Sequence, residues 1–500
     1  MNLTLEPQGI KEAVAGLKFR TQAFIDGRFG PSSSGQTYAS INPANGKPIA
    51  QIASCDVEDI NRAVAAARRA FNSGCWSKLK PGDRKAIMLK FVERLEAHAM
   101  EIALLDSLDA GKPIYDCVNI DIPDAIHCIH WHAELIDKLY ERVSPTGPEN
   151  VAMIVREPIG VVGMIVPWNF PAQMMAWKIG PALAAGNCLV VKPAKQTSLS
   201  ALRIAELAAE AGIPAGVLNV VPGSGAVIGA ALCRHMDVEM VAFTGSTEVG
   251  RSLLKYSAES NLKRVILELG GKNPQVVLSD PPDLDLVAAN ALNSAFWNMG
   301  ENCSSGSRLI VHRLHKDALL AKLIEQCHTW PVGDPLNPAN RVGPLIEKSH
   351  METVLRYIAA GHADGAKLVL GGQRTLLATG GNFVELTIFD EVNNNMKIAR
   401  EEIFGPVLGV LPVDSDDEAI AVANDTNYGL AASLYTRDVN KAHRVARALR
   451  AGTVSVNCFS EGDLATPFGG FKESGFFGRD KSIYAQEQYA ELKTIWMQIG

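Results

Sequence analysis

Short apolar runs alternate with helical segments through the middle of this 500-residue chain, and this alternation limits the fold more than any other feature. A strand that is apolar throughout is buried on both faces, and helices between such strands form βαβ units with a parallel sheet. Ser198 is placed to begin one of these helices, and Gly212, followed by Pro214, to end it. The strands that we expect are residues 161–166, 189–191, 217–221, 240–243 and 265–267. The segment therefore predicts a doubly wound α/β domain.

A second alternation of the same kind begins after Gly270 and Gly271. The first 110 residues predict strands followed by helices, and Asp56 with Asp59 has the spacing of a capping box at a helix N-terminus. Because 500 residues are too many for one hydrophobic core, we predict two α/β domains with a boundary close to Gly270. The second domain's expected strands are residues 275–278, 308–311, 407–411 and 453–456, and its expected helices are 315–327, 350–360 and 439–450.

Charge and hydropathy exclude several classes of function. Lys and Arg number 48 against 54 Asp and Glu, so the formal net charge is −6, without the concentrated basic surface that nucleic acid or an anionic membrane requires. Apolar stretches such as residues 159–166 are too short to span a bilayer, and the N-terminal residues lack the apolar core of a secretion signal. We therefore expect a cytoplasmic protein that binds neither nucleic acid nor membrane.

Two glycine-containing turns are candidates for binding a nucleotide. The turn Gly223-Ser-Gly225-Ala-Val-Ile-Gly229 follows an expected strand, but its last gap is one residue longer than in the dinucleotide fingerprint. By itself it can equally be a tight strand–helix turn. In the second turn, Gly245 and Ser246 stand at an expected helix N-terminus, where free amides and the helix dipole favour phosphate. Two such turns in one sheet favour nucleotide binding.

Nine cysteines lie scattered along the chain without a Cys-x-x-Cys pair, which indicates a reducing compartment. Cys303 stands in a polar, glycine-containing loop, where a substrate can reach a thiolate. Glu268 ends an apolar strand, where parallel sheets present reactive groups. These two residues are a candidate nucleophile and its acid or base. The alternatives stay open that Cys303 is an inert loop cysteine and that Glu268 is a helix cap or an ion-pair partner.

Three neighbouring histidines could indicate a metal site. On a helix, His127 and His130 share a face while His132 points elsewhere, and no carboxylate, histidine and cysteine set completes a tetrahedral site. We therefore interpret them as packing histidines and expect no metal.

Seven short motifs occur in order along nearly the whole chain. They are Val166-Pro-Trp168-Asn169-Phe170-Pro, Val191-Lys192-Pro193, Phe243-Thr-Gly245-Ser246-Thr, Leu267-Glu268-Leu-Gly270-Gly271, Gly300-Glu-Asn-Cys303, Glu401-Glu402-Ile-Phe404-Gly-Pro406 and Pro467-Phe468-Gly-Gly470-Phe-Lys472. Taken together, these motifs resemble the NAD(P)-dependent aldehyde dehydrogenase superfamily. Within it, the stretch Ile120-Asp-Ile-Pro123 and the tail Gly478-Arg-Asp480-Lys-Ser are similar to bacterial γ-glutamyl-γ-aminobutyraldehyde dehydrogenases of polyamine breakdown.

The resemblance implies two doubly wound α/β domains and a small β element that bridges subunits. The cofactor-binding domain would hold residues 1–139 and 159–270, the catalytic domain 271–480, and the bridging element 140–158 and 481–500. An apolar edge strand near the C-terminus requires a partner, so we expect a homo-oligomer, a tetramer built as a dimer of dimers.

The resemblance also implies the reaction, which is the irreversible oxidation of an aldehyde to the carboxylic acid with NAD(P)+. Cys303 would attack the aldehyde to form a thiohemiacetal, while the Asn169 amide and the Cys303 N–H hold the developing oxyanion. Hydride transfer to the nicotinamide would leave a thioester, which water activated by Glu268 hydrolyses. Lys178 would assist proton movement behind Glu268.

For the cofactor, the resemblance places Glu402 and Phe404 at the nicotinamide and its ribose, Lys192 at the adenosine ribose and Ser246 at the pyrophosphate. Many NAD-preferring members have Glu three residues after the ribose lysine, whereas this chain has Lys195. A lysine there attracts a 2′-phosphate, so we expect NADP to be used alongside NAD unless Lys195 turns into solvent. The remaining residues expected around the cofactor are Ile165, Val166, Pro167, Trp168, Gly225, Phe243, Gly245, Val249 and Leu269.

For the substrate, the matching positions predict an aromatic tunnel with acidic residues at its mouth. Asp124, Glu461 and Asp463 fall at or near the mouth and favour neutral or cationic ω-amino aldehydes over carboxylate-bearing ones, unless these surface charges steer nothing. Aliphatic and aryl aldehydes also fit an aromatic tunnel. The remaining residues expected along it are Phe170, Gln173, Met174, Trp177, Phe296, Asn302, Ser304, Phe459 and Phe468.

Two other classes of function remain. A CoA-acylating relative would use a cysteine but lacks the hydrolytic glutamate, and Glu268 is present. A non-catalytic binding or structural protein on this fold should have lost its nucleophile or nicotinamide-site residues, and none is lost.

Overall fold

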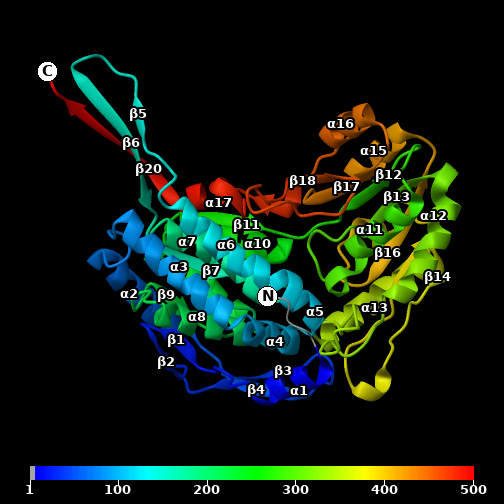
Figure 1. Cartoon of the computed structure of the whole chain (residues 1–500), viewed down its shortest axis with the longest axis horizontal. Helices are drawn as coiled ribbons and strands as arrows, with labels where there is room; N and C mark the ends of the chain where they lie inside the picture. Colours follow the sequence, from blue (N-terminus) through cyan, green and yellow to red (C-terminus); the bar gives the residue numbers. More distant parts are fainter. Residues whose placement is uncertain (1–5) are drawn as a thin grey trace.

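The computed structural model describes residues 6–500 and contains two large sheets (Figure 1). The first sheet has eight strands in the order β19-β11-β10-β7-β8-β9-β1-β2, of which the five from β11 to β9 are parallel. These five are the predicted strands. Their bounds are β7 Val161–Ile165, β8 Cys188–Lys192, β9 Leu218–Val220, β10 Met240–Thr244 and β11 Arg264–Glu268, and the antiparallel edge strands are β1 Ala23–Ile25, β2 Arg28–Gly30 and β19 Gly475–Phe476.

Helices surround this sheet. Asp56 caps α2 as predicted, because its side chain accepts from the Asp59 N–H and the Asp59 side chain accepts from the Asp56 N–H. Every residue of α7 is buried, so this helix forms part of the interior rather than a surface. The main helices are α2 Val57–Ser73, α3 Pro81–Ala97, α4 Ala99–Ala110, α6 Ile122–Leu135, α7 Pro171–Ala184, α8 Leu199–Glu210 and α10 Thr247–Ala258.

The second sheet has seven strands in the order β14-β15-β16-β13-β12-β17-β18, and all but β14 are parallel to their neighbours. Its bounds are β12 Pro274–Val277, β13 Arg308–His312, β14 Lys367–Leu370, β15 Thr387–Asp390, β16 Val407–Val413, β17 Ala431–Tyr435 and β18 Thr453–Val456. The predicted strands correspond to β12, β13, β16 and β18. The helices are α11 Leu284–Phe296, α12 Arg313–Gln326, α13 Lys348–Ala363, α14 Lys397–Arg400, α15 Asp416–Asn424 and α16 Val439–Ala448.

A three-stranded arm extends away from both large sheets (Figure 1). It consists of β5 Arg142–Ser144, β6 Asn150–Pro158 and β20 Ala490–Gln498, with β20 antiparallel to β6 along its whole length. Helix α17 Ser482–Gln488 comes just before β20. The outer strand β20 leaves Leu492 and Trp496 largely exposed, at 73% and 62%. The domain boundaries near residues 139, 159, 270 and 480 stay a prediction.

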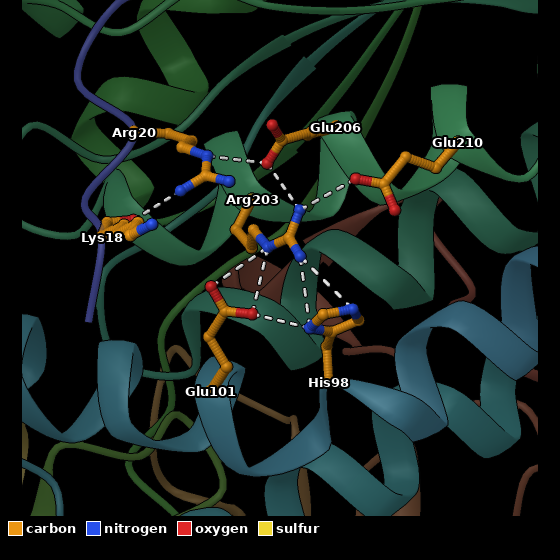
Figure 2. A network of polar contacts seen from close by, with 7 residues as sticks. All are labelled: Lys18, Arg20, His98, Glu101, Arg203, Glu206 and Glu210. Carbon is orange, nitrogen blue, oxygen red and sulfur yellow. Dashed lines mark hydrogen bonds and ion pairs between the residues drawn. The ribbon is translucent and has the colours of Figure 1, made fainter. Parts of the chain in front are cut away.

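An ionic network ties the N-terminal segment to the first domain (Figure 2). Arg203 on α8 lies between Glu101 on α4, at 3.1 Å, and Glu206 on its own helix, which also accepts from Arg20 at 2.7 Å. His98 and Glu210 complete the set. Arg20 lies between α1 Pro7–Ala15 and β1, so the network fixes the segment that follows α1. After β2 comes the hairpin of β3 Thr37–Ile41 and β4 Pro48–Ala53.

Within residues 6–500, no helix combines the length and apolar character needed to cross a membrane. The same residues contain no group of three or more His, Cys, Asp or Glu side chains arranged to hold a metal ion. His132 is fully buried, and burial lowers its pKa to about 3, whereas His127 and His130 are exposed.

Candidate active site

The loop that carries Cys303 is built from an unusual backbone turn. Asn298, Met299 and Gly300 all have left-handed conformations, with φ of 52°, 59° and 71°. Two hydrogen bonds of the Asn298 side chain help to offset the strain of this backbone conformation. Its amide donates to the Glu301 carbonyl at 3.0 Å and to the Asn169 carbonyl at 3.1 Å. The turn brings the partly exposed Cys303 side chain to the C-terminal edge of the first sheet, beside Leu269.

A buried lysine connects this loop to Asn169. The Lys112 ammonium donates to the Asn169 carbonyl at 2.9 Å and to the Asn298 side-chain oxygen, and it pairs with Asp121 at 3.2 Å. It also lies 3.6 Å from the centroid of the Phe170 ring. The Asn169 amide donates one hydrogen to the Glu301 carbonyl at 3.0 Å, so its second N–H stays available. The sequence analysis did not find Lys112, because no local pattern marks it.

Two cavities meet at the Cys303 thiol, since Met174, Thr244, Leu269 and Cys303 line both. The narrow cavity has a volume of about 380 Å³ and the wide cavity about 730 Å³. The other residues of the narrow cavity are Phe170, Gln173, Trp177, Glu268, Asn302, Glu461, Phe468 and Asp480. The other residues of the wide cavity are Pro167, Trp168, Asn169, Gly245, Ser246, Gly270, Glu402 and Phe404.

Helix α7 supplies one wall of the narrow cavity. Gln173, Met174 and Trp177 recur at helical spacing and so share a face of α7. The Trp177 ring meets the Phe468 ring edge to face at 5.5 Å. The wall is therefore aromatic and apolar, with a few polar groups placed along it.

Glu268 lies at the end of β11, where it is buried and lines the narrow cavity. Neither of its carboxylate oxygens forms a hydrogen bond with residues 6–500. Glycines make room for it, since a Cβ at Gly469 or Gly478 would lie 2.7 or 2.6 Å from its Oε1. Burial, followed by repulsion from Asp480, raises the pKa of Glu268 well above its usual value. A carboxyl with a raised pKa and no fixed partner is suited to exchanging protons.

Behind Glu268, Lys178 and Asp480 form a fully buried ion pair at 3.1 Å. Lys178 comes from α7 and was predicted, whereas Asp480 was known only as part of a motif. The pair brings a second carboxylate and an ammonium into the surroundings of Glu268, and the ammonium lowers the pKa of Glu268.

Burial raises the pKa of the Cys303 thiol well above its ordinary value, and the nearby carboxylates of Glu461, Glu402 and Glu268 raise it further. The Cys303 main-chain N–H donates no hydrogen bond within the described chain. It is therefore free to bind an oxygen that develops negative charge at the carbon attacked by the thiol.

The wide cavity has the groups that a dinucleotide requires. Gly245 and Ser246 line the cavity just before α10, and Ser246 caps this helix by accepting from the Val249 N–H. A helix N-terminus at a cavity favours a phosphate group. Glu402 accepts from the Gly271 N–H at 2.7 Å, and burial raises its pKa to about 7. Trp168 and Phe404 meet at right angles, 5.4 Å apart, as an apolar surface for a ring. These residues fit NAD(P).

Several predicted cofactor residues lie beside the wide cavity rather than on it. Lys192 is buried at the end of β8 next to Gly225, and burial lowers its pKa to about 8. Lys195 is exposed and lies 5.2 Å from the centroid of the Tyr38 ring. Thr244 and Gly270 line the cavity and stand in two of the seven motifs, but they were not predicted as cofactor residues. The other predicted residues outside the lining are Ile165, Val166, Gly225, Phe243 and Val249.

Of the predicted tunnel residues, too, some line or adjoin the cavity and others lie outside its lining. The Asp124 carboxylate adjoins the narrow cavity and accepts from Gln173 at 2.8 Å and from the Trp177 ring at 2.6 Å. The structure does not place Phe296 on the cavity, because this side chain is fully buried in the second domain's core. Phe459 packs against Trp297, at 6.3 Å between ring centroids, outside the lining.

The acidic residues at the predicted mouth are not equivalent. Glu461 lines the narrow cavity and accepts from the Ser304 hydroxyl. Asp463 is exposed and accepts from the Ala465 N–H at 2.9 Å within its own loop, away from the lining residues. The position of Asp463 therefore does not support the prediction that it acts at the mouth together with Glu461.

Lys481 is a further residue that the sequence analysis missed. It is buried, its ammonium donates to the Glu461 carbonyl at 2.8 Å, and it lies 4.8 Å from the Trp177 ring and 5.4 Å from the Phe468 ring. It fixes the main chain at Glu461 and supports two rings of the cavity wall.

Comparison with known proteins gives consistent matches over the chain. A model described as the aldehyde dehydrogenase family matches residues 29–495. The aminoacetaldehyde dehydrogenase of Pseudomonas aeruginosa is 56% identical over 97% of each chain. The NADP/NAD-dependent aldehyde dehydrogenase PuuC of Escherichia coli is 46% identical over 98% of each chain. The crystal structure of γ-glutamyl-γ-aminobutyraldehyde dehydrogenase from Burkholderia cenocepacia superposes with a TM-score of 0.97 at 50% identity, covering all of both chains.

Proposed function

The chain belongs to the aldehyde dehydrogenase family, and from this premise we propose which of its residues carry out the reaction and on which aldehydes. The enzyme oxidises an aldehyde to the carboxylic acid with NAD(P)+, so the predicted family, α/β fold class and activity are confirmed. The observation that supports our assignment of residues is the meeting of the two cavities at Cys303. The narrow cavity would hold the aldehyde, and the wide cavity the cofactor.

Cys303 acts as the nucleophile. The thiol first loses its proton to solvent, and the thiolate sulfur then adds to the aldehyde carbon while the carbonyl π electrons move to oxygen. The free Cys303 N–H and the second N–H of Asn169 would hold the resulting oxyanion, an interaction worth about 3–4 kcal/mol for one donor in comparable sites. Lys112 holds Asn169 in place for this role.

The cofactor supplies the oxidising step, because its nicotinamide accepts the hydride from the thiohemiacetal carbon and leaves a thioester on Cys303. Trp168 and Phe404 would hold the ring, and Glu402 the ribose hydroxyls. Lys192 would reach the adenosine ribose. The E. coli relative PuuC is named as dependent on NADP and NAD, which supports the use of both cofactors here.

Glu268 then serves hydrolysis. Its carboxylate takes a proton from water, the hydroxide adds to the thioester carbonyl, and the carbon–sulfur bond breaks to release the acid and the thiolate. Lys178 and Asp480 adjust the proton affinity of Glu268. The presence of this carboxylate in the narrow cavity argues against the CoA-acylating alternative, in which a second thiol would take the acyl group.

For the substrate, we propose ω-amino, aliphatic or aryl aldehydes. The apolar wall of Phe170, Trp177 and Phe468 would bury an alkyl chain or a ring, and Asp124 with Glu461 would favour an ammonium group at its end. The relatives named for aminoacetaldehyde and γ-glutamyl-γ-aminobutyraldehyde support the ω-amino class.

A panel of kcat/KM values tests this assignment, with alkyl, ω-amino, ω-carboxylate and aryl aldehydes matched in length. We expect the ω-carboxylate aldehyde to be the poorest substrate. If it is the best, the charge argument is wrong. Acyl-CoA formation on addition of CoA would instead support the acylating alternative.

We also propose that the enzyme is a cytoplasmic homo-oligomer, a dimer of dimers. The strand β20 at the edge of the arm and the strand β18 at the edge of the second sheet each lack a partner on one side among the described residues. Pairing between edge strands of two subunits would satisfy both and cover the apolar side chains of β20.

A further inference from the structure

Glu461 is connected to the nucleophile through one intervening side chain. Its Oε1 accepts from the hydroxyl of Ser304, the residue after Cys303, and both Glu461 and Cys303 line the narrow cavity. Its other oxygen accepts no hydrogen bond within residues 6–500. The Lys481 ammonium binds the main-chain carbonyl of Glu461, not its carboxylate. The carboxylate is therefore held by the residue next to Cys303 at a shared cavity, and its second oxygen has no donor among the described residues.

Of the charges around Cys303, Glu461 raises the pKa of the thiol most, after burial itself. The other charged groups facing the thiol are also carboxylates, Glu402 from the loop after α14 and Glu268 from the end of β11. The cations of this region are engaged elsewhere, since Lys178 pairs with Asp480 and Lys481 lies against two rings. The protein groups around the thiol thus disfavour the thiolate.

Asp124, the other acidic residue predicted at the tunnel mouth, accepts more hydrogen bonds than Glu461. Its Oδ2 accepts from both Gln173 and the Trp177 ring, whereas the Glu461 carboxylate has a single hydroxyl donor. A cation that enters the cavity therefore gains more from Glu461, whose charge is less compensated.

We propose that Glu461 makes the reactivity of Cys303 depend on the charge of the substrate, so that an ammonium group bound at Glu461 releases the thiolate. In the free enzyme the carboxylate repels the negative sulfur. A bound ammonium neutralises that repulsion, and the thiol gives up its proton when a cationic ω-amino aldehyde is in place. Glu461 then favours cationic substrates in two ways, by binding their ammonium group and by making Cys303 more reactive when they are bound. The inference rests on the proposed role of Cys303.

Alkylation of Cys303 by iodoacetamide tests this without aldehyde turnover, with the modified peptide quantified by mass spectrometry between pH 6 and 10. Glu461→Gln keeps an acceptor for Ser304 and removes the charge. Its alkylation midpoint should move to lower pH by about one unit. Below the midpoint the rate should rise only about threefold, because the tenfold gain in thiolate is offset by the lower nucleophilicity of a more acidic thiol. Asp463→Asn, with the same change of charge in the same loop, should leave the profile unchanged.

A second measurement uses the wild-type chain. Millimolar propylammonium should speed alkylation of Cys303, and propanol should not. Glu461→Gln should abolish the response to propylammonium. In turnover, the same variant should lower kcat/KM for 3-aminopropanal several-fold relative to butanal, which has the same number of chain atoms.

An alkylation profile that is the same in Glu461→Gln and the wild type, or an ammonium response that survives in this variant, overturns the inference. Neither result touches the proposed function, which fails separately if Cys303→Ser still oxidises aldehydes.

Discussion

The Lys112 ammonium donates a 2.9 Å hydrogen bond to the main-chain carbonyl of Asn169, 57 residues further along the chain. The same ammonium binds the Asn298 side chain, whose amide holds the loop leading to Cys303. One buried cation thus sets the relative position of the proposed oxyanion donor and the proposed nucleophile. The arrangement makes Lys112 a positioning residue that contacts neither substrate nor cofactor in the proposed mechanism.

Lys112→Met should lower kcat by at least about tenfold while leaving KM for NAD nearly unchanged, because a displaced oxyanion donor weakens transition-state binding only. The variant also leaves Asp121 buried without its ion partner, which should reduce the free energy of unfolding by about 3–5 kcal/mol. Steady-state kinetics and urea unfolding measure the two effects. The double variant Lys112→Met with Asp121→Asn should recover stability but not kcat. Recovery of both would mean that Lys112 acts only on folding.

Cys303→Ser should nearly abolish aldehyde oxidation, because a serine hydroxyl lacks thiolate character and a good acyl leaving group. Glu268→Gln should slow turnover but retain a pre-steady-state burst of NAD(P)H, since hydride transfer precedes the hydrolysis that Glu268 serves. Stopped-flow absorbance at the reduced nicotinamide band measures the burst. Loss of the burst in Glu268→Gln would show that Glu268 also activates the thiol.

Asp480→Asn should move the acidic limb of the kcat profile to lower pH. Burial first and repulsion from Asp480 next raise the pKa of Glu268, and hydrolysis requires its ionised form, so activity rises as pH rises through that pKa. Removing the Asp480 charge lowers the pKa, and the limb follows it downward. Lys178 loses its partner, so the Tm is measured alongside. An acidic limb that stays in place in a folded variant would contradict the coupling.

Lys195→Glu should weaken NADP selectively. An exposed cation gains about 0.5–1 kcal/mol from a 2′-phosphate, which corresponds to roughly two- to fivefold in KM. Lys195 is exposed near the Tyr38 ring, beside the buried Lys192, which fits this weak and solvent-screened interaction. Lys367→Glu, on the second domain, is the control with the same change of charge. Equal changes in KM for NAD and NADP would rule out contact with the phosphate.

Leu492→Glu with Trp496→Glu should shift the enzyme toward smaller species. Both side chains are largely exposed on β20, and a subunit interface there would have to bury the added carboxylates. Light scattering at micromolar concentration measures the mass of both forms. A wild-type chain that is a stable monomer would contradict the proposed oligomer at once.

The sequence predicted strands best where the apolar run was continuous. Strands β7, β8 and β10 are fully or almost fully buried and were predicted with ends within two residues. Strand β17 was missed because its first residues, Ala431 and Ala432, do not mark a strand, although it lies between β12 and β18. Strand β19 is two residues long and exists only through its pairing with β11.

The residues of the candidate site also fall into those that a local sequence pattern marks and those that only tertiary contacts place. Cys303, Glu268 and Asn169 could be named from motifs, because each is chemically distinct and each motif is local. Phe296 was expected at the cavity from the positions that match the family, but it is fully buried and is not among the residues that line the narrow cavity. Lys112 carried no local signal, and Lys481 stood in a motif without an assigned role, since the partners of both lie far away in sequence.

The sequence by itself determined which chemical groups this protein has: a thiol, a carboxylate and a carboxamide in family motifs, on strands and loops of an α/β fold. Only the tertiary structure decided the electrostatic state of those groups. Glu461 meets Ser304 across 157 residues, and Lys178 meets Asp480 across 302. Charge interactions depend on distance and on burial away from water, and linear order specifies neither until the chain has folded.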